Sequence, residues 1–390
     1  MARKRSPNGF GSIRKKVING NIYYEGRYTD PILHKQKSVS ATTEKECRQK
    51  LKDIFAKITT GVYVTPHKLT VAEWAKQWLD GKESIKVGTR ADYQRHIDNY
   101  ITPELGKIHL CDLRPIHCQE FVRTITKKGE SGKELSAKTV GNIIGTLHSM
   151  LDSAVRLELI SSNPSSKLEK PKVQKKAVKV LEKDVQADFL REIADSKYKN
   201  IHLLGMHTGA RISELLGLRW SRVNLEEGII TIDAQLARQR KGVCSRGLAS
   251  TKTDNIRTIV VPDFVTAVLR EERRAQAEAR MKAGPHWDND LDLVFTREDG
   301  SPMPHTTIAN DFKRIAERIG KPELSFHALR HTYATDEISS GTDPKTVADT
   351  LGHSTVAMTM DVYAAASTDA KKAAAKRRED EYRAKKLKSN

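Results

Sequence analysis

The most informative stretch of this 390-residue chain is LSFHALRHTYAT, residues 324–335. It places His327 and Arg330 three residues apart, so a helix through the stretch presents both side chains on one side. There the two groups can converge on one phosphate. His327 and His331 also have the spacing of a zinc-binding pair, but the metalloprotease pattern requires Glu directly after the first His, where this chain has Ala328. The stretch therefore argues against a zinc site.

The residues that follow predict two further helices. Asp343 and Pro344 form a good N-cap and first-turn pair, and the helix that they begin should stop at Gly352. This stop places His353 in a turn, and Tyr363 follows on the next short helix. A tyrosine on a short helix is usually buried, with its hydroxyl hydrogen-bonded to a core group. Tyr363 alone is therefore no evidence for a catalytic role.

Upstream, residues 207–220 have the sequence HTGARISELLGLRW, which predicts a turn followed by a helix. Ile212, Leu215 and Leu216 supply the buried face of this helix. Arg211 stands at its start, beside a glycine turn, where its side chain is preorganised. An isolated arginine is more often a surface or ion-pairing residue, so the candidate role of Arg211 depends on the rest of the chain.

A candidate lysine lies between these two regions. The strand-like segments 228–233 and 257–261 flank TKTDN, residues 251–255, and place Lys252 near a hairpin turn. Lysines in exposed turns are ordinarily just solvated.

The N-terminal part of the chain has the pattern of a small β-sheet backed by one helix. The Asn19-Gly20 pair between two alternating runs is a strong hairpin signal, a third strand is expected at 35–40, and a capping-box pattern at 43–46 begins the helix. Such a unit has little core, so its basic strand residues should lie on an exposed sheet face. These residues are Arg14, Lys15, Lys16 and Arg27. By charge alone, a merely solvated surface is an equally good interpretation.

Helical periodicity begins near residue 70, after an interrupted segment at 62–68. A capping box opens the first helix, a second helix follows Lys86 to Arg90, and the clearest helix begins near Lys138 with apolar residues every three or four positions. These helices predict a compact bundle. From residue 163 the chain becomes polar and rich in lysine, as is typical of an extended basic linker.

The composition limits the class of partner. Lys and Arg number 68 against 49 Asp and Glu, a net charge of +19, which favours a polyanion because each neutralised phosphate releases counterions. Ribosomal and membrane-surface proteins are also basic. No apolar run approaches the roughly 18 residues that span a bilayer, and the first residues lack a signal peptide, so we expect a cytoplasmic, nucleoid-associated protein. Four scattered cysteines indicate neither a zinc knuckle nor a disulfide framework.

The order and context of the candidate residues resemble the tyrosine recombinase, or phage integrase, family. The matching residues are Arg211, Lys252, His327, Arg330, His353 and Tyr363. The resemblance spans most of the chain and is greatest to integrases of Gram-positive conjugative transposons. It implies a multidomain fold, mainly α with small antiparallel β-sheets (α+β). The expected parts are an arm-type DNA-binding domain of three strands plus a helix (1–66), a helical core-binding domain (67–165), a linker (166–178) and a catalytic domain with a C-terminal tail helix (179–390).

The chemistry of this family accounts for the residue types. A phosphodiester is protected by its negative charge and by a poor alkoxide leaving group, so a catalyst must neutralise charge and supply a proton. Arg211 and Arg330 can fork onto the non-bridging oxygens in place of metal ions. A tyrosine side chain free in water has a pKa of about 10 and is a weak nucleophile at neutral pH, so Tyr363 needs a base, for which His327 is the candidate.

The resemblance further implies Lys252 as the acid that protonates the departing 5′-hydroxyl and His353 as a hydrogen-bonding partner of the phosphate or base. A 3′-phosphotyrosyl ester stores the broken bond, so rejoining needs no ATP, and we expect no metal or other cofactor. Family logic implies a homotetramer on two double-stranded DNA segments, with strand exchange through a Holliday junction. An excisionase and a host DNA-bending protein are possible further partners.

Expected DNA contacts outside the catalytic set lie in the first two domains, at Arg14, Lys15, Lys16, Arg27, Lys86, Arg90 and Lys138. The basic, helix-prone tail after residue 369 is expected to pack on a neighbouring subunit, and the alternative is a frayed, solvated helix.

Two other functions fit part of the sequence. A type IB topoisomerase shares the Arg, Lys, Arg, His and Tyr chemistry but relaxes supercoils, and the N-terminal layout argues against it. A non-catalytic DNA-binding regulator would leave the full catalytic set without a use.

Overall fold

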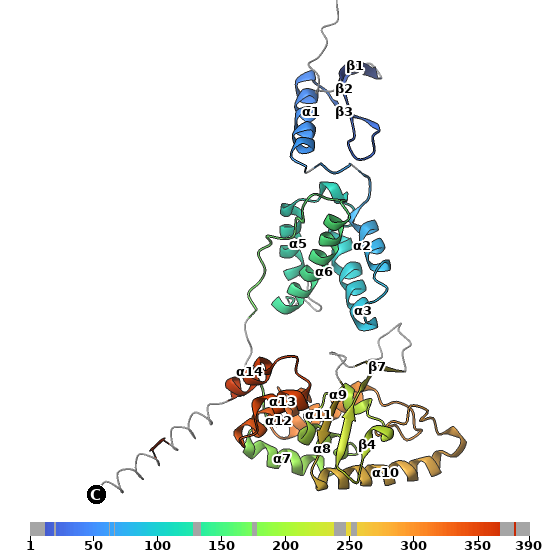
Figure 1. The fold of residues 1–390 in the computed structure, drawn as a ribbon, viewed down its shortest axis with the longest axis vertical. Coiled ribbons are helices and arrows are strands. Elements are labelled where there is room, and N and C mark those ends of the chain that lie inside the picture. Colours follow the sequence, from blue (N-terminus) through green and yellow to red (C-terminus); the bar gives the residue numbers. More distant parts are fainter. Residues whose placement is uncertain are drawn as a thin grey trace, which may run out of the picture. The chain divides into compact units, whose positions relative to one another are not determined.

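The computed structural model describes residues 12–18, 21–61, 63–65, 67–127, 134–173, 178–237, 247–250, 256–366 and 378–379. The chain divides into two compact units, residues 1–174 and 175–390. Both units combine helices with small antiparallel sheets (Figure 1), which confirms the fold class predicted from the sequence. No helix within the described ranges is long and apolar enough to cross a membrane.

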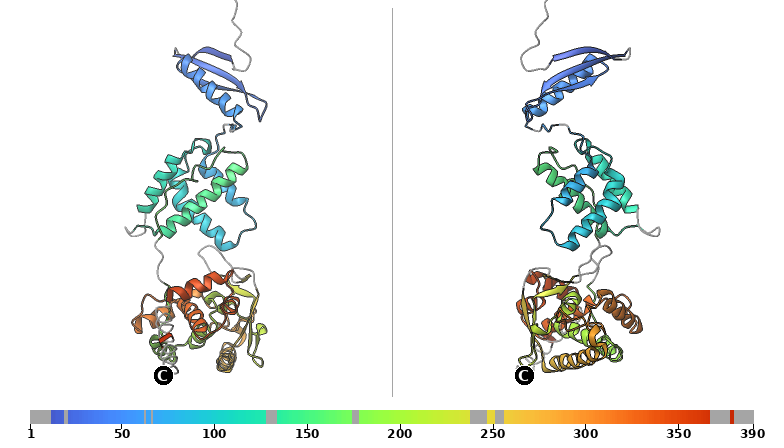
Figure 2. Two further views of the ribbon diagram at one scale, coloured as in Figure 1. Left: turned by 60° about the vertical axis from the view of Figure 1, so that its left-hand side comes forward. Right: turned by 90° about the vertical axis from the view of Figure 1, so that its right-hand side faces the viewer.

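The first unit begins with a three-stranded antiparallel sheet. Its strands β1 (Ser12–Ile18), β2 (Asn21–Thr29) and β3 (Gln36–Ala41) pair in that order, and α1 (Glu44–Thr59) follows. Both views of Figure 2 show α1 along one face of this sheet. There Cys47 and Leu51 are buried against Gly26, where any side chain larger than hydrogen would meet Leu51 Cδ1 at 2.7 Å. The predicted sheet and helix are therefore present.

The basic residues of this sheet do not all share one face. Arg14 lies opposite Glu25, which also bonds to Lys16 and Arg27, so these three basic residues lie on the face away from α1. Lys15 lies between two of them in the strand and belongs to the helix-covered face, because successive residues of a strand alternate. The expectation that all four basic residues share one face is therefore wrong for Lys15, although Lys15 is exposed as expected.

A helical bundle makes up the rest of the first unit. Trp74 on the first helix donates from Nε1 to the carbonyl of Met150 on the last helix at 3.0 Å, and both side chains are buried. Thr70 and Glu73 form the predicted capping box. The helices are α2 (Val71–Asp80), α3 (Val87–His96), a π-helical turn (Ile97–Ile101), α4 (Thr102–Leu105), a 3-10 turn (Leu110–Asp112), α5 (Pro115–Lys127) and α6 (Ala137–Arg156).

The second unit places helices around two small sheets. One sheet has the order β4-β5-β8 and the other pairs β6 with β7, all antiparallel. The strands are β4 (Val223–Asn224), β5 (Ile229–Ile232), β6 (Ala234–Leu236), β7 (Leu248–Ser250) and β8 (Arg257–Val260). The helices are α7 (Lys183–Ile193), α8 (Lys199–Thr208), α9 (Ile212–Leu216), α10 (Asp263–Ala283), α11 (His305–Arg318), α12 (His327–Ser339), α13 (Pro344–Leu351) and α14 (Val356–Ala366), with 3-10 turns at Trp220–Arg222 and Gly284–His286. One apolar core, with Phe189, Phe312 and Leu329 fully buried, joins α7 to α12 with the β4-β5-β8 sheet. A second, smaller cluster with Leu351 and Val362 joins α12, α13 and α14.

The ends of α13 match the sequence prediction. The Asp343 carboxylate accepts hydrogen bonds from the amides of Lys345 and Thr346, both at 3.0 Å. Gly352 ends the helix in a left-handed conformation (φ 66°), which a residue without a Cβ adopts at little cost. Position 353 is thereby turned out of the helix.

Candidate active site

The first part of the site is the turn between α8 and α9. Gly209 ends α8 in a left-handed conformation (φ 60°), and Arg211 then occupies the N-cap of α9. The Arg211 amide donates to Glu214 Oε2 at 2.9 Å, and its Nη1 donates to Oε1 at 2.7 Å. The Glu214 side chain is 1% exposed and that of Arg211 is 21% exposed. A buried carboxylate therefore anchors a guanidinium that still reaches the surface.

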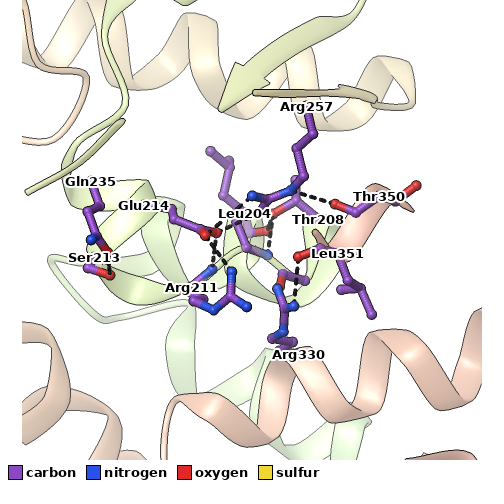
Figure 3. A network of polar contacts seen from close by, with 12 residues as sticks. Leu204, Thr208, Arg211, Ser213, Glu214, Gln235, Arg257, Arg330, Thr350 and Leu351 are labelled. Atoms are coloured by element: carbon purple, nitrogen blue, oxygen red, sulfur yellow. Dashed lines mark hydrogen bonds and ion pairs between the residues drawn. The ribbon is translucent and has the colours of Figure 1, made fainter. Parts of the chain in front are cut away.

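A second arginine, Arg257 at the start of β8, holds the same carboxylate. Its Nη2 donates to Glu214 Oε2 at 2.6 Å, and its Nε donates to the Thr350 carbonyl at 2.7 Å. Burial pushes the pKa of Glu214 upward, but hydrogen bonds and charges from Arg257 and Arg211 outweigh it, so this pKa lies below its usual value. Figure 3 shows the resulting carboxylate with one guanidinium on either side.

Arg330 is the most deeply buried arginine of the group, at 2% exposure. It lies one turn into α12, where Nη1 donates to the Gly209 carbonyl at 2.9 Å and Nη2 to the Leu351 carbonyl at 2.6 Å. Burial, followed by the charge of Arg211, lowers the pKa of Arg330 to about 9, and the side chain therefore remains a cation at neutral pH. Two main-chain oxygens far apart in the sequence thus hold this charge beside the Arg211 turn.

Three histidines lie beside these arginines. The rings of His327 and His331 meet edge to face with centroids 4.6 Å apart, and His353 Nδ1 is 2.6 Å from Thr359 Oγ1. Burial, followed by Arg330 and other positive neighbours, lowers the pKa of half-buried His353 to about 4. The pKa of His327 is also lowered, first by burial and then by His331 and Arg330. His353 is therefore neutral at pH 7, and a neutral ring has one nitrogen that accepts a proton.

Tyr363 lies on α14, which packs against α12 and α13. Val362 joins an apolar cluster with Leu351 of α13, and the buried Thr359 bonds to His353. Tyr363 itself is half-buried. Packing therefore fixes the tyrosine-bearing helix against α12, which carries Arg330, and against α13, whose end leads into His353.

Two models of known protein families match this chain. The phage integrase family matches residues 179–369, and the phage integrase N-terminal SAM-like domain matches residues 70–125. Together the matches cover more than half of the chain, and the first includes the whole arginine, histidine and tyrosine set. The chain belongs to the phage integrase family. This integrase is therefore a tyrosine recombinase, an enzyme that cleaves and rejoins DNA strands, as the sequence predicts.

Curated relatives agree with this assignment. The integrase is 28% identical over 371 residues to a tyrosine recombinase XerC-like protein of Caldanaerobacter subterraneus subsp. tengcongensis, covering 89% of this chain and 93% of the relative. It is 23% identical over 345 residues to the transposase from transposon Tn916 of Enterococcus faecalis, covering 85% and 82% of the two chains. The second match agrees with the predicted resemblance to transposon integrases.

Solved structures share the fold of this integrase. The Tn1549 transposon integrase in complex with transposon right end DNA is 22% identical, with a TM-score of 0.67 and coverage of 79% of this chain and 99% of that chain. A lambda integrase dimer bound to a COC' core site is 16% identical, with a TM-score of 0.57 and coverage of 94% and 97%. These similarities confirm the multidomain integrase fold.

The other predicted site residues of the integrase are Lys252, Arg90, Lys86 and Lys138. Lys252 lies outside the described residues, in the segment between β7 and β8. Arg90 donates from Nη1 to the carbonyls of Leu79 at 2.9 Å and Lys82 at 3.3 Å, and from Nη2 to Asp80 at 3.3 Å. These bonds cap the C-terminal end of α2, so Arg90 has a structural use beside its predicted contact with DNA. Lys86 and Lys138 are exposed.

Sequence reasoning missed Glu214 and Arg257. Glu214 lies three residues after Arg211 at a predicted helix start, and this spacing is the available signal for a carboxylate that reaches back to the first turn. Arg257 has no such local signal, since its partners lie 43 and 93 residues away. Among the described residues, no group of three His, Cys, Asp or Glu side chains is placed to hold a metal ion.

Proposed function

We propose that this chain is the site-specific recombinase of a mobile element and catalyses both integration and excision. The observation that supports this best is the position of Arg330. Its buried guanidinium is held beside Arg211 by carbonyls of Gly209 and Leu351, on a helix packed against the one that bears Tyr363. Such an arrangement offers two cations to a phosphate and a hydroxyl nucleophile from an adjacent helix.

The two arginines bind the scissile phosphate. Each guanidinium presents several N–H groups in a plane, which suits the non-bridging oxygens, and neither loses its charge at working pH. His353 donates a further hydrogen bond to the phosphate. Negative charge that develops in the transition state is thereby met by preorganised donors.

Tyr363 performs the cleavage. Its phenolic oxygen forms a bond to phosphorus as the bond from phosphorus to the 5′-oxygen breaks, which leaves a 3′-phosphotyrosyl ester and a free 5′-hydroxyl. His327 accepts the phenolic proton and Lys252 donates a proton to the departing oxygen. Attack of a 5′-hydroxyl from a second duplex reverses these steps, so rejoining requires neither ATP nor a metal ion.

The substrate is double-stranded DNA with core and arm sites, and the working assembly is a homotetramer that passes through a Holliday junction. In this proposal residues 1–66 bind arm sites, residues 67–165 bind the core site with Lys86 and Lys138 among the contacts, and residues 166–178 link them to the catalytic domain at 179–390. An excisionase and a host DNA-bending protein would set direction. Arg14, Lys16 and Arg27 share the open sheet face that arm DNA would meet.

A nicked suicide substrate made from the element's own core site tests the proposal. Loss of the short nicked fragment prevents rejoining, so a covalent protein–DNA adduct should accumulate on a denaturing gel, in EDTA as well as in buffer. Tyr363→Phe should bind the same DNA and form no adduct. Bound DNA with no adduct from the wild type would favour a regulator, and supercoil relaxation without recombination of paired sites would favour a topoisomerase.

A further inference from the structure

Arg257 connects three parts of the site that are distant in sequence. It begins β8, the strand that follows the segment containing Lys252, and its side chain is 8% exposed. One edge of its guanidinium bonds to Glu214, and Nε bonds to the Thr350 carbonyl at the end of α13. Figure 3 shows this side chain reaching both partners from its strand.

We propose that Arg257 is a positioning residue for strand cleavage, which neutralises Glu214 so that Arg211 stays available to the phosphate and which fixes the end of α13. This inference rests on the proposed function. Arg257 itself does not touch DNA in this scheme, and it acts through Glu214 and through the peptide that leads into His353.

Arg257 balances the charge of the buried Glu214 carboxylate. Glu214 is 1% exposed and bonds to Arg211 Nη1 at 2.7 Å, while Arg257 forks onto both carboxylate oxygens at 2.6 and 3.3 Å. The two guanidiniums and one carboxylate together keep one net positive charge. Among the described residues, Arg211 uses only Nη1 of its guanidinium in hydrogen bonds. Without Arg257, Arg211 alone would balance the carboxylate. The net positive charge beside the phosphate would then fall by one, and the phosphate would be bound less strongly.

Arg257 also holds the end of α13. The last carbonyls of a helix have no partner within it and carry partial negative charge, so they favour cations. Here Arg257 binds the Thr350 carbonyl and Arg330 binds the Leu351 carbonyl. Gly352 follows with its backbone against Arg257, where an added Cβ would lie 3.1 Å from the side chain. The turn that presents His353 and leads to α14 is therefore held by two arginines.

Single-turnover cleavage of the nicked core site measures this role. Arg257→Met should slow adduct formation about 10- to 100-fold, the loss typical when a group that orients a functional residue is removed, while the Kd for core DNA changes little. Arg257→Lys keeps the charge but cannot fork, so it should recover part of the rate. Arg270→Met is the matched control, because Arg270 also donates to a main-chain carbonyl, that of Leu225 at 2.8 Å, and should cleave at the wild-type rate.

A neutral substrate separates electrostatics from mere loss of structure. Replacing the scissile phosphate by a methylphosphonate removes the charge that Arg257 indirectly helps to neutralise, so the Arg257→Met deficit should shrink on that substrate. A deficit of equal size on both substrates would overturn the electrostatic role. The double variant Glu214→Gln, Arg257→Met removes the carboxylate together with its partner and should cleave faster than Arg257→Met alone.

The remaining outcomes are also decisive. Wild-type cleavage rates in both Arg257→Met and Arg257→Lys would overturn the inference, since the proposed function would stand while Arg257 proved dispensable. If Arg257→Met fails to fold, Arg257→Lys and the double variant still report on the same prediction. Absence of an adduct from the wild-type protein would instead refute the proposed function.

Discussion

The two arginines predicted to bind phosphate are held in different ways. Arg330 is 2% exposed and satisfies two main-chain carbonyls, whereas the Arg211 side chain is 21% exposed and bonds to Glu214, which Arg257 also holds. The two arginines therefore contribute differently to stability. Removal of Arg330 leaves buried acceptors without a partner, and removal of Arg211 does not.

Replacement by methionine should separate these roles. Arg330→Met leaves the carbonyls of Gly209 and Leu351 unsatisfied, and the free energy of unfolding should fall by roughly 2 to 5 kcal/mol. Arg211→Met should lose about 1 kcal/mol or less, because Glu214 keeps Arg257. Both should abolish adduct formation. Urea unfolding of the two variants measures the difference, and equal losses of stability would contradict it.

His353 gives a pH dependence with a definite sign. Its folded-state pKa of about 4 lies below the unfolded value of about 6.5, so between these values the unfolded chain binds more protons. Its contribution to stability is therefore complete above pH 6.5 and is lost as the pH falls toward 4. An NMR titration of the free protein should place the His353 ring near pH 4. In His353→Asn, the loss of stability between pH 7 and pH 5 should be smaller, and an unchanged loss would argue against this assignment.

At the scale of elements, the site depends on how α8, α12 and α13 approach each other. Gly209 lies where they meet: a Cβ there would be 2.4 Å from Leu351 and 2.8 Å from Tyr333. The left-handed turn that starts α9 is thus also a point of close packing. The left-handed conformation favours glycine at this helix end, and packing explains why no other residue fits.

A matched pair of glycines tests this point. Gly209 and Gly320 have similar left-handed conformations (φ 60° and 70°), but nothing lies within 4 Å of a Cβ added to Gly320. Gly320→Ala should therefore cost only backbone strain, about 1 to 2 kcal/mol. Gly209→Ala adds the clash and should cost at least twice as much, with slower adduct formation as Leu351 shifts. Denaturation midpoints of both variants measure this, and equal destabilisation would show that the contact relaxes freely.

At the scale of the whole molecule, the proposed division of labour places arm binding and cleavage in different parts of the chain. The chain has a net charge of +19, which favours a polyanion such as DNA. The sheet and α1 pack around their own small core of Cys47 and Leu51. Their removal should therefore spare the catalytic unit.

Deletion of residues 1–66 is the corresponding experiment. The shortened protein should form the covalent adduct on a nicked core site at close to the full-length rate, whereas synapsis on complete attachment sites should weaken strongly. Adduct gels and native gels of the two proteins, on the same DNA, provide the measurements. Equal loss of both activities would refute the division.

The sequence by itself determined the local features of this integrase. The capping box of α2, the N-cap of α13, the stop at Gly352 and the helix of His327 and Arg330 follow from residues within a turn or two, where propensity and hydrogen bonding act. The fold class followed instead from the resemblance to the integrase family that the order of the candidate residues carries. The π-helical turn after α3 had no such signal.

Only the tertiary structure decided how the site is held together. Glu214, Arg257 and Thr350 meet across separations of 43 and 93 residues, and Arg330 reaches Gly209 across 121. Such contacts depend on how helices and strands pack, because a buried charge takes whichever partner the fold brings within reach. The same cause gave Arg90 its bonds at the end of α2, whereas the alternation of side chains along β1 already separates Lys15 from Arg14 and Lys16. Residue type and spacing set the chemistry, and packing selected the partners that position it.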